Sequence, residues 1–174
     1  MTPHWWRTRV DMTPTDNPNR IRQIRQRALV IAQQEIGKGE TMGNNQGRDV
    51  WKYTRNRKSK GPWCAAFVIW CIEEAAKHYA VPCPIERTHG ARRLYKRIGK
   101  FGQFIDKEEM PEPGDIVCWW RGDTIRDYRG HIGFVDSVNA NGLIRTLEGN
   151  RGKFPAKVKL YTLRTRRLLG YARL

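Results

Sequence analysis

The stretch GPWCAAFVIWCIEEAAK, residues 61–77, decides the fold of this chain. Its second residue, Pro62, suits the first turn of a helix, and the residues from Trp63 to Ile72 are all apolar. A helix that is apolar on nearly every side lies inside a protein, so we expect a buried central helix over residues 63–77. The apolar run of ten residues is about half of what a helix needs to cross a bilayer, which argues against a membrane span.

Amphipathic helices are predicted on both sides of this central helix. Isoleucine and alanine recur at steps of three to five residues from Pro18 to Ile36, with arginines at other positions. Residues 90–100 predict a further helix, with Thr88 as its expected N-cap. Residues 40–61 are rich in Gly, Asn and basic residues without a period, so we expect a long loop with a helical turn at 50–53.

Strand-type runs dominate the chain after these helices. They cover residues 115–120, 131–138, 142–147, 157–165 and 168–173, and Asn139-Ala140-Asn141-Gly142 is a hairpin signal. Helices followed by antiparallel strands predict an α+β fold in which N-terminal helices pack on a C-terminal antiparallel sheet. The chain contains no internal repeat and no low-complexity segment, so we expect one domain.

The domain is expected to span residues 18–174. Residues 1–17 carry few core residues and read as an N-terminal arm that includes Trp5 and Trp6. The arm has no extended apolar stretch followed by a cleavage site, so no secretory signal peptide is predicted.

The charge of the chain is strongly positive. Lysine and arginine number 33 against 17 aspartates and glutamates, which gives a formal net charge of +16 at pH 7. A field of this size attracts polyanions such as nucleic acid, anionic lipid or acidic wall polymer. Basic runs interleaved with aromatic residues could bind nucleic acid, but the sequence contains no known nucleic-acid motif, which makes that partner unlikely.

Cys64 is the candidate nucleophile among four cysteines. It lies at the first turn of the expected central helix, where free N–H groups and the helix dipole favour the reactive thiolate. Cys71 falls in the middle of the same helix, Cys118 in a strand and Cys83 between prolines, so we expect these three to be structural. No cysteine or histidine spacing is typical of a zinc site.

His131 is the candidate base. It opens an expected strand in Gly130-His131-Ile132-Gly133, where glycines allow another backbone or a substrate to come close. A thiolate nucleophile needs such a base and a third group that orients it. Glu148 and Asn150, at the end of the following strand, are the candidates for that group.

Four blocks of the sequence have a known counterpart. In order, they are Pro62-Trp63-Cys64-Ala65-Ala66-Phe67-Val68, Pro113-Gly114-Asp115-Ile116-Val117, Gly130-His131-Ile132-Gly133-Phe134-Val135 and Glu148-Gly149-Asn150. They resemble the signature blocks of CHAP domains, the cysteine- and histidine-dependent amidohydrolases and peptidases. These domains belong with the NlpC-type papain-like peptidoglycan hydrolases and include the catalytic domains of phage endolysins. The resemblance covers about residues 25–150.

The resemblance implies a papain-like fold and a thiol mechanism. Cys64 would attack an amide carbonyl, His131 would take the thiol proton and later protonate the leaving amine, and Glu148 would orient the imidazole. Asn150 would steer His131 or the oxyanion. The implied function is hydrolysis of peptidoglycan, as an N-acetylmuramoyl-L-alanine amidase or as an endopeptidase of the stem peptide or cross-bridge. The alternative is a non-catalytic basic protein that binds nucleic acid or an anionic wall polymer.

The expected partners are peptidoglycan and anionic cell-wall polymers, and we expect a monomer without a cofactor. The resemblance also implies action on the cell wall, by a phage-encoded protein or after export by a non-classical route. Substrate contacts are expected at Trp63, Asn44, Trp120 and Gly130. Some CHAP domains hold calcium with several aspartates before the nucleophile, but residues 40–61 contain only Glu40 and Asp49 as acids. A calcium cage needs more oxygen ligands than these, so no metal is expected.

Overall fold

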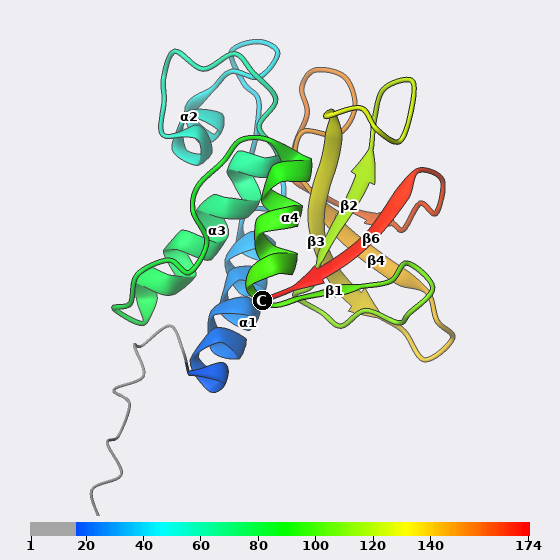
Figure 1. The fold of residues 1–174 in the computed structure, drawn as a ribbon. Coiled ribbons are helices and arrows are strands. Elements are labelled where there is room, and N and C mark those ends of the chain that lie inside the picture. The colour runs from blue at the N-terminus through cyan, green and yellow to red at the C-terminus, as the bar shows by residue number, and fades with distance from the viewer. Residues whose placement is uncertain (1–16) are drawn as a thin grey trace, which may run out of the picture.

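The computed structural model describes residues 17–174, which form four helices and six strands (Figure 1). The helices are α1 (Pro18–Gln34), α2 (Arg48–Thr54), α3 (Cys64–His78) and α4 (Ala91–Phe101). The strands are β1 (Gln103–Ile105), β2 (Ile116–Trp120), β3 (Gly130–Val138), β4 (Ile144–Glu148), β5 (Lys159–Thr162) and β6 (Leu168–Arg173). The predicted α+β fold is confirmed.

The strands form one antiparallel sheet in the order β1-β6-β2-β3-β4-β5. The helices gather on one side of this sheet, and α3 lies between α1 and the sheet (Figure 1). The main core fills this space, and Ile69, Phe134 and Leu147 are among its fully buried side chains. A smaller cluster that includes Val117 and Trp119 covers the other face of the sheet. Burial on both faces explains why β2 reads as a continuous apolar run.

Three features depart from the sequence prediction. The expected turn at 50–53 is part of the seven-residue helix α2. Strand β1 has only three residues and was not predicted, because its pairing with β6 comes from tertiary structure. Thr88 does not cap α4: Gly90 is the N-cap residue, and the Thr88 hydroxyl accepts a hydrogen bond from the Gly90 N–H at 3.3 Å.

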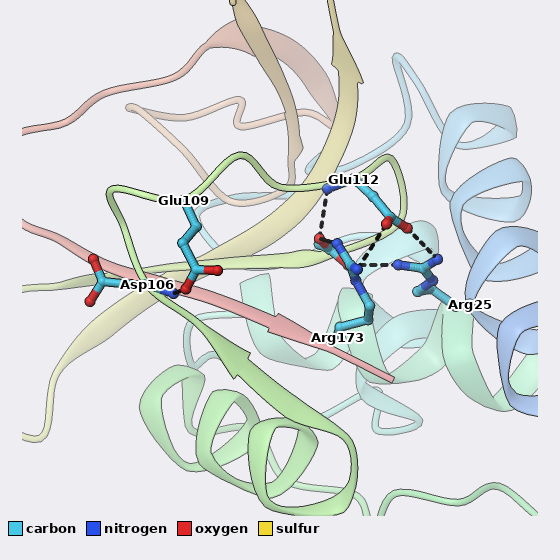
Figure 2. A network of polar contacts seen from close by, with 6 residues as sticks. Arg25, Asp106, Glu109, Glu112 and Arg173 are labelled. Atoms are coloured by element: carbon cyan, nitrogen blue, oxygen red, sulfur yellow. Dashed lines mark hydrogen bonds and ion pairs between the residues drawn. The ribbon is translucent and has the colours of Figure 1, made fainter. Parts of the chain in front are cut away.

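A network of ion pairs fastens α1 to the sheet (Figure 2). Asp115 is fully buried, and its carboxylate accepts hydrogen bonds from Arg25 Nη1 at 2.8 Å and from Arg173 Nη2 at 2.7 Å. Glu112 accepts from the same two arginines at 2.8 Å. Asp115 directly precedes β2, so the network fixes one end of this strand. The other end of β2 reaches the candidate site.

The expected arm, residues 1–17, lies outside the described residues apart from Asn17. The Asn17 side chain caps α1 by accepting hydrogen bonds from the N–H groups of Asn19 and Arg20, at 3.0 and 3.4 Å. Within residues 17–174, no helix is both long enough and apolar enough to span a membrane.

Candidate active site

Cys64 is the first residue of α3 and is 4% exposed. The residue before it, Trp63, is fully buried, and its indole ring stacks on Tyr53 with the ring centroids 5.5 Å apart. This packing fixes the start of the helix. The N–H groups of the first turn have no carbonyl partner one turn earlier, so they and the helix dipole act on the thiol.

His131 lies beside Cys64, near the start of β3, and is fully buried. Its Nε2 atom is 2.8 Å from Oε2 of Glu148, the last residue of the neighbouring strand β4. Its Nδ1 atom is buried and has no partner of ordinary hydrogen-bond geometry in residues 17–174. Because Nε2 is engaged with Glu148, the ring leaves Nδ1 for the thiol of Cys64.

The two reactive groups shift each other's pKa. Burial raises the pKa of the Cys64 thiol, but the neighbouring His131 ring and the positive charges of His131 and Arg121 outweigh burial and lower the pKa from its usual 9.0. Burial lowers the pKa of His131, but the neighbouring Cys64 thiol and the hydrogen bond to Glu148 outweigh burial and raise the pKa from 6.5. Opposite shifts of this kind favour a thiolate–imidazolium pair.

Glu148 is fully buried and is held from several directions. The Thr146 hydroxyl donates to Oε1 at 2.7 Å, and Arg151 Nη1 donates to the same oxygen at 2.9 Å. Arg164 Nη2 lies 3.7 Å from Oε2. Burial raises the pKa of Glu148, but His131, Thr146 and Arg151 together lower it below 4.5, so the carboxylate is ionised at neutral pH.

Two glycines make room for this arrangement. A Cβ atom at Gly133 would lie 2.7 Å from the carbonyl oxygen of Leu147 and 2.9 Å from Cγ of Glu148. A Cβ atom at Gly149 would lie 2.5 Å from the Trp63 ring. The glycines of the two sequence blocks therefore allow β4 to approach β3 and the start of α3 closely.

The structure brings Cys64, His131 and Glu148 together, and the other predicted site residues differ in their positions. The Trp63 ring is fully buried in the core, and the expected substrate contact at this residue stays a prediction. Asn150 follows β4 with a positive φ of 58°. Among the described residues its side chain makes no hydrogen bond, so its steering role stays a prediction.

The other three residues expected to contact the substrate lie at the surface or near it. Asn44 is exposed in a turn that closes between Gly43 and Gln46. Trp120 is half-buried at the end of β2, with the Arg167 guanidinium 4.6 Å from the centre of its ring. Gly130 pairs with Trp120 and faces Arg92, whose Cγ would lie 2.6 Å from a Cβ atom at Gly130.

Sequence reasoning missed one buried carboxylate near the nucleophile. Glu40 is 1% exposed and accepts hydrogen bonds from the indole Nε1 of Trp63 at 3.2 Å and from the N–H groups of Asn45 and Ala156, both at 2.8 Å. It therefore ties residue 63 to two loops. Glu40 lies 23 residues before Trp63 in the sequence, so no local pattern predicts the contact between them.

Glu40 and Asp49, the only acids of residues 40–61, both accept hydrogen bonds from N–H groups. Glu40 has the three donors described above, and Asp49 accepts from the Gly39 N–H at 3.1 Å. In the described part of the chain, no group of three or more His, Cys, Asp and Glu side chains could hold a metal ion.

The other three cysteines differ from Cys64. All four are free thiols. Burial raises the pKa of Cys71, Cys83 and Cys118 above the usual value, so each stays a neutral thiol. Cys64 alone combines a helix N-terminus with a histidine neighbour.

One helix, α3, places a cysteine against a histidine and a glutamate from adjacent antiparallel strands, which is the arrangement expected of the papain-like class of α+β folds. Sequence comparison gives the family within this class. The model of the CHAP domain matches residues 56–150, and the chain belongs to the CHAP domain family. The resemblance seen in the four sequence blocks is thereby confirmed.

Solved structures show the same fold. A variant of RipA, the Resuscitation Promoting Factor Interacting protein, has a TM-score of 0.55 and 16% identity over 91% of this chain and 65% of that chain. A hypothetical invasion protein of Mycobacterium tuberculosis has a TM-score of 0.52 and 17% identity over 88% of this chain and 62% of that chain. An NLP/P60-family protein of Staphylococcus aureus, similar to a lipoprotein, has a TM-score of 0.50 and 17% identity over 86% of this chain and 41% of that chain.

The chain thus spans less than two-thirds of the length of each of these proteins. At such low identity the likeness establishes the fold. No curated protein matches the sequence significantly.

Proposed function

We propose that this CHAP domain is a thiol hydrolase that cleaves amide bonds in peptidoglycan, with Cys64 as nucleophile, His131 as general base and acid, and Glu148 as the group that orients His131. One observation carries the proposal. The only cysteine with a lowered pKa lies next to a buried histidine whose other nitrogen is 2.8 Å from a buried glutamate.

In the first half of the reaction, the Cys64 thiolate adds to the amide carbonyl carbon and the carbonyl electrons move onto oxygen. The backbone N–H of Cys64, at the start of α3, is the candidate donor to that oxyanion. When the tetrahedral intermediate collapses, the C–N bond breaks and the His131 imidazolium gives its proton to the leaving amine. The acyl group remains on Cys64 as a thioester.

In the second half, neutral His131 removes a proton from water as the water oxygen adds to the thioester carbonyl. The C–S bond then breaks, the carboxyl product leaves, and the thiolate–imidazolium pair is restored. Glu148 keeps the imidazole in one orientation through both halves and stabilises its charged form.

Digestion of purified peptidoglycan, followed by mass spectrometry of the released fragments, tests this function. A new carboxyl group on the lactyl part of N-acetylmuramic acid, with a free L-alanine amino group, would identify an amidase. New ends within the stem peptide or cross-bridge would identify an endopeptidase. Absence of released fragments from walls of several chemical types, combined with salt-sensitive binding to nucleic acid or wall polymer, would instead favour the non-catalytic alternative.

A further inference from the structure

An arginine-lined hollow lies beside the Cys64–His131–Glu148 site. Four arginines and no acid line it, and they come from the end of β2 and from the loop between β5 and β6. The complete lining is Trp119, Trp120, Arg121, Gly122, Arg164, Arg166 and Arg167. A concave surface with charge of one sign concentrates ligands of the opposite sign.

The loop that carries three of these arginines is fastened to β2. The indole Nε1 of Trp119 donates to the carbonyl oxygen of Arg164 at 2.7 Å, and the N–H of Trp120 donates to the carbonyl oxygen of Arg167 at 3.0 Å. The Arg164 guanidinium lies 5.1 Å from the centre of the Trp119 ring. Because these bonds fix the loop backbone, ligand binding does not have to order the loop, which lowers the entropic cost of binding.

The positive charge of the hollow is poorly neutralised. Within residues 17–174, Arg121, Arg166 and Arg167 form no ion pair, and the only acid near Arg164 is Glu148 at 3.7 Å. Burial lowers the pKa of Arg164, and the positive charges of Arg151 and Arg121 lower it further, although Glu148 opposes them. Cations placed this close repel each other, so an anion in the hollow would be stabilising.

The hollow adjoins the reacting groups. The rings of Trp119 and His131 are 5.7 Å apart, and Arg164 reaches from the hollow to Glu148. An anion bound here would therefore belong to the molecule whose amide bond lies at Cys64. A guanidinium presents a planar pair of N–H donors that matches a carboxylate or a phosphate. A peptide whose amide bond lies at Cys64 carries carboxylates, which favours a carboxylate as the bound group.

We propose that the arginine-lined hollow binds a free carboxylate of the peptide being cleaved, so that the enzyme prefers acidic wall peptides to peptides whose carboxylates are amidated. This inference rests on the proposed function and adds the class of substrate to it. The residues that would confer the preference are Arg121, Arg166 and Arg167, with Arg164 shared between the hollow and Glu148.

The kinetic test uses two peptidoglycan fragments that differ only in whether the stem carboxylates are free or amidated. We expect kcat/KM of the unchanged protein to be about tenfold higher for the free form, mainly through KM, which is the effect of one charge-assisted contact. The double variant Arg166→Gln/Arg167→Gln should cleave both fragments within about twofold of each other. The matched control Arg22→Gln/Arg93→Gln removes two exposed arginines elsewhere and should keep the preference.

A binding test separates this inference from the proposed function. Calorimetry with the Cys64→Ala variant measures the affinity for both fragments without turnover. Tighter binding of the free form, lost when Arg166→Gln/Arg167→Gln is added, would support the hollow as a carboxylate site even if the unchanged protein cleaved neither fragment. Arg121→Gln in the same background gives an independent check should the double variant fail to fold.

Equal cleavage and equal binding of the two fragments by a folded protein would overturn the inference while leaving the hydrolase function in place. Equal cleavage of the fragments, combined with slower digestion of whole walls from which phosphate polymers have been stripped, would also overturn it. That result would assign the hollow to a phosphate-bearing polymer.

Discussion

His131 and Glu148 are joined by a buried hydrogen bond of 2.8 Å between two adjacent strands. The carboxylate reaches the ring past Gly133, and Thr146 and Arg151 hold its other oxygen. The orientation of the imidazole is therefore set by protein groups and does not depend on solvent. A ring fixed in this way keeps Nδ1 available to Cys64.

The pH profile of kcat/KM should be bell-shaped. Activity rises as Cys64 loses its proton, at a pH below the ordinary thiol value of 9.0 because its pKa is lowered. Activity falls as the His131 imidazolium loses its proton, at a pH above the ordinary 6.5 because its pKa is raised. An alkaline limb that is absent, or that lies at or below pH 6.5, would count against His131 as the base.

The variant Glu148→Gln should move the alkaline limb of that profile to lower pH, because the amide no longer supplies the negative charge that raises the pKa of His131. We expect kcat to fall by at least about tenfold, because the His131 ring loses the carboxylate that fixes its orientation. The control, Glu109→Gln, changes an exposed carboxylate far from the site in sequence and should leave the profile unchanged. An alkaline limb that stays in place in Glu148→Gln would contradict the assigned role.

The variant Gly133→Ala should reduce both activity and stability, because its Cβ atom meets the Leu147 carbonyl oxygen and Cγ of Glu148. We expect a loss of about 1–3 kcal/mol in the free energy of unfolding, typical of overpacking. Gly61→Ala is the matched control, since a Cβ atom there has no neighbour within 4 Å. Urea denaturation and kcat of both variants provide the measurement, and equal values for the two would refute the close approach of β4 to β3.

The variant Asp115→Ala should destabilise the fold without changing the reacting groups. It removes the buried acceptor of Arg25 and Arg173, and breaking a buried ion pair costs about 3–5 kcal/mol (Figure 2). Lys77→Ala removes an exposed partner of Glu74 and should cost less than about 1 kcal/mol. Thermal unfolding distinguishes the two, and similar melting temperatures would show that the network contributes little.

Much of the fold could be predicted from local patterns. The apolar run from Trp63 to Ile72 predicted the buried helix α3, and the hairpin signal at 139–142 matches the turn between β3 and β4. Strand β1 could not be predicted, since its three residues acquire strand geometry only by pairing with β6. The length of α2 was also missed, because its buried residues Val50 and Tyr53 are too few to show a helical period.

The sequence predicted the three residues that the structure brings together at the candidate site, Cys64, His131 and Glu148, but it predicted less of their surroundings. Cys64 follows Gly61 and Pro62, and His131 follows Gly130, so local sequence was enough to predict both. Glu40, Arg151 and Arg164 were not recognised, because their functions come from contacts that only the folded chain brings together. Trp63 was expected to contact the substrate, and the burial of its ring in the core could not be predicted because its partners Tyr53 and Glu40 are distant in sequence.

The identity of the nucleophile is tested most directly by comparing peptidoglycan hydrolysis by Cys64→Ala and Cys71→Ala with that of the unchanged protein. Both variants remove a buried thiol from α3, so they are matched in chemistry and in element. We predict that Cys71→Ala releases wall fragments at a rate near that of the unchanged protein once it is corrected for the folded fraction. Cys64→Ala should release none. Continued release of fragments by folded Cys64→Ala would contradict the account.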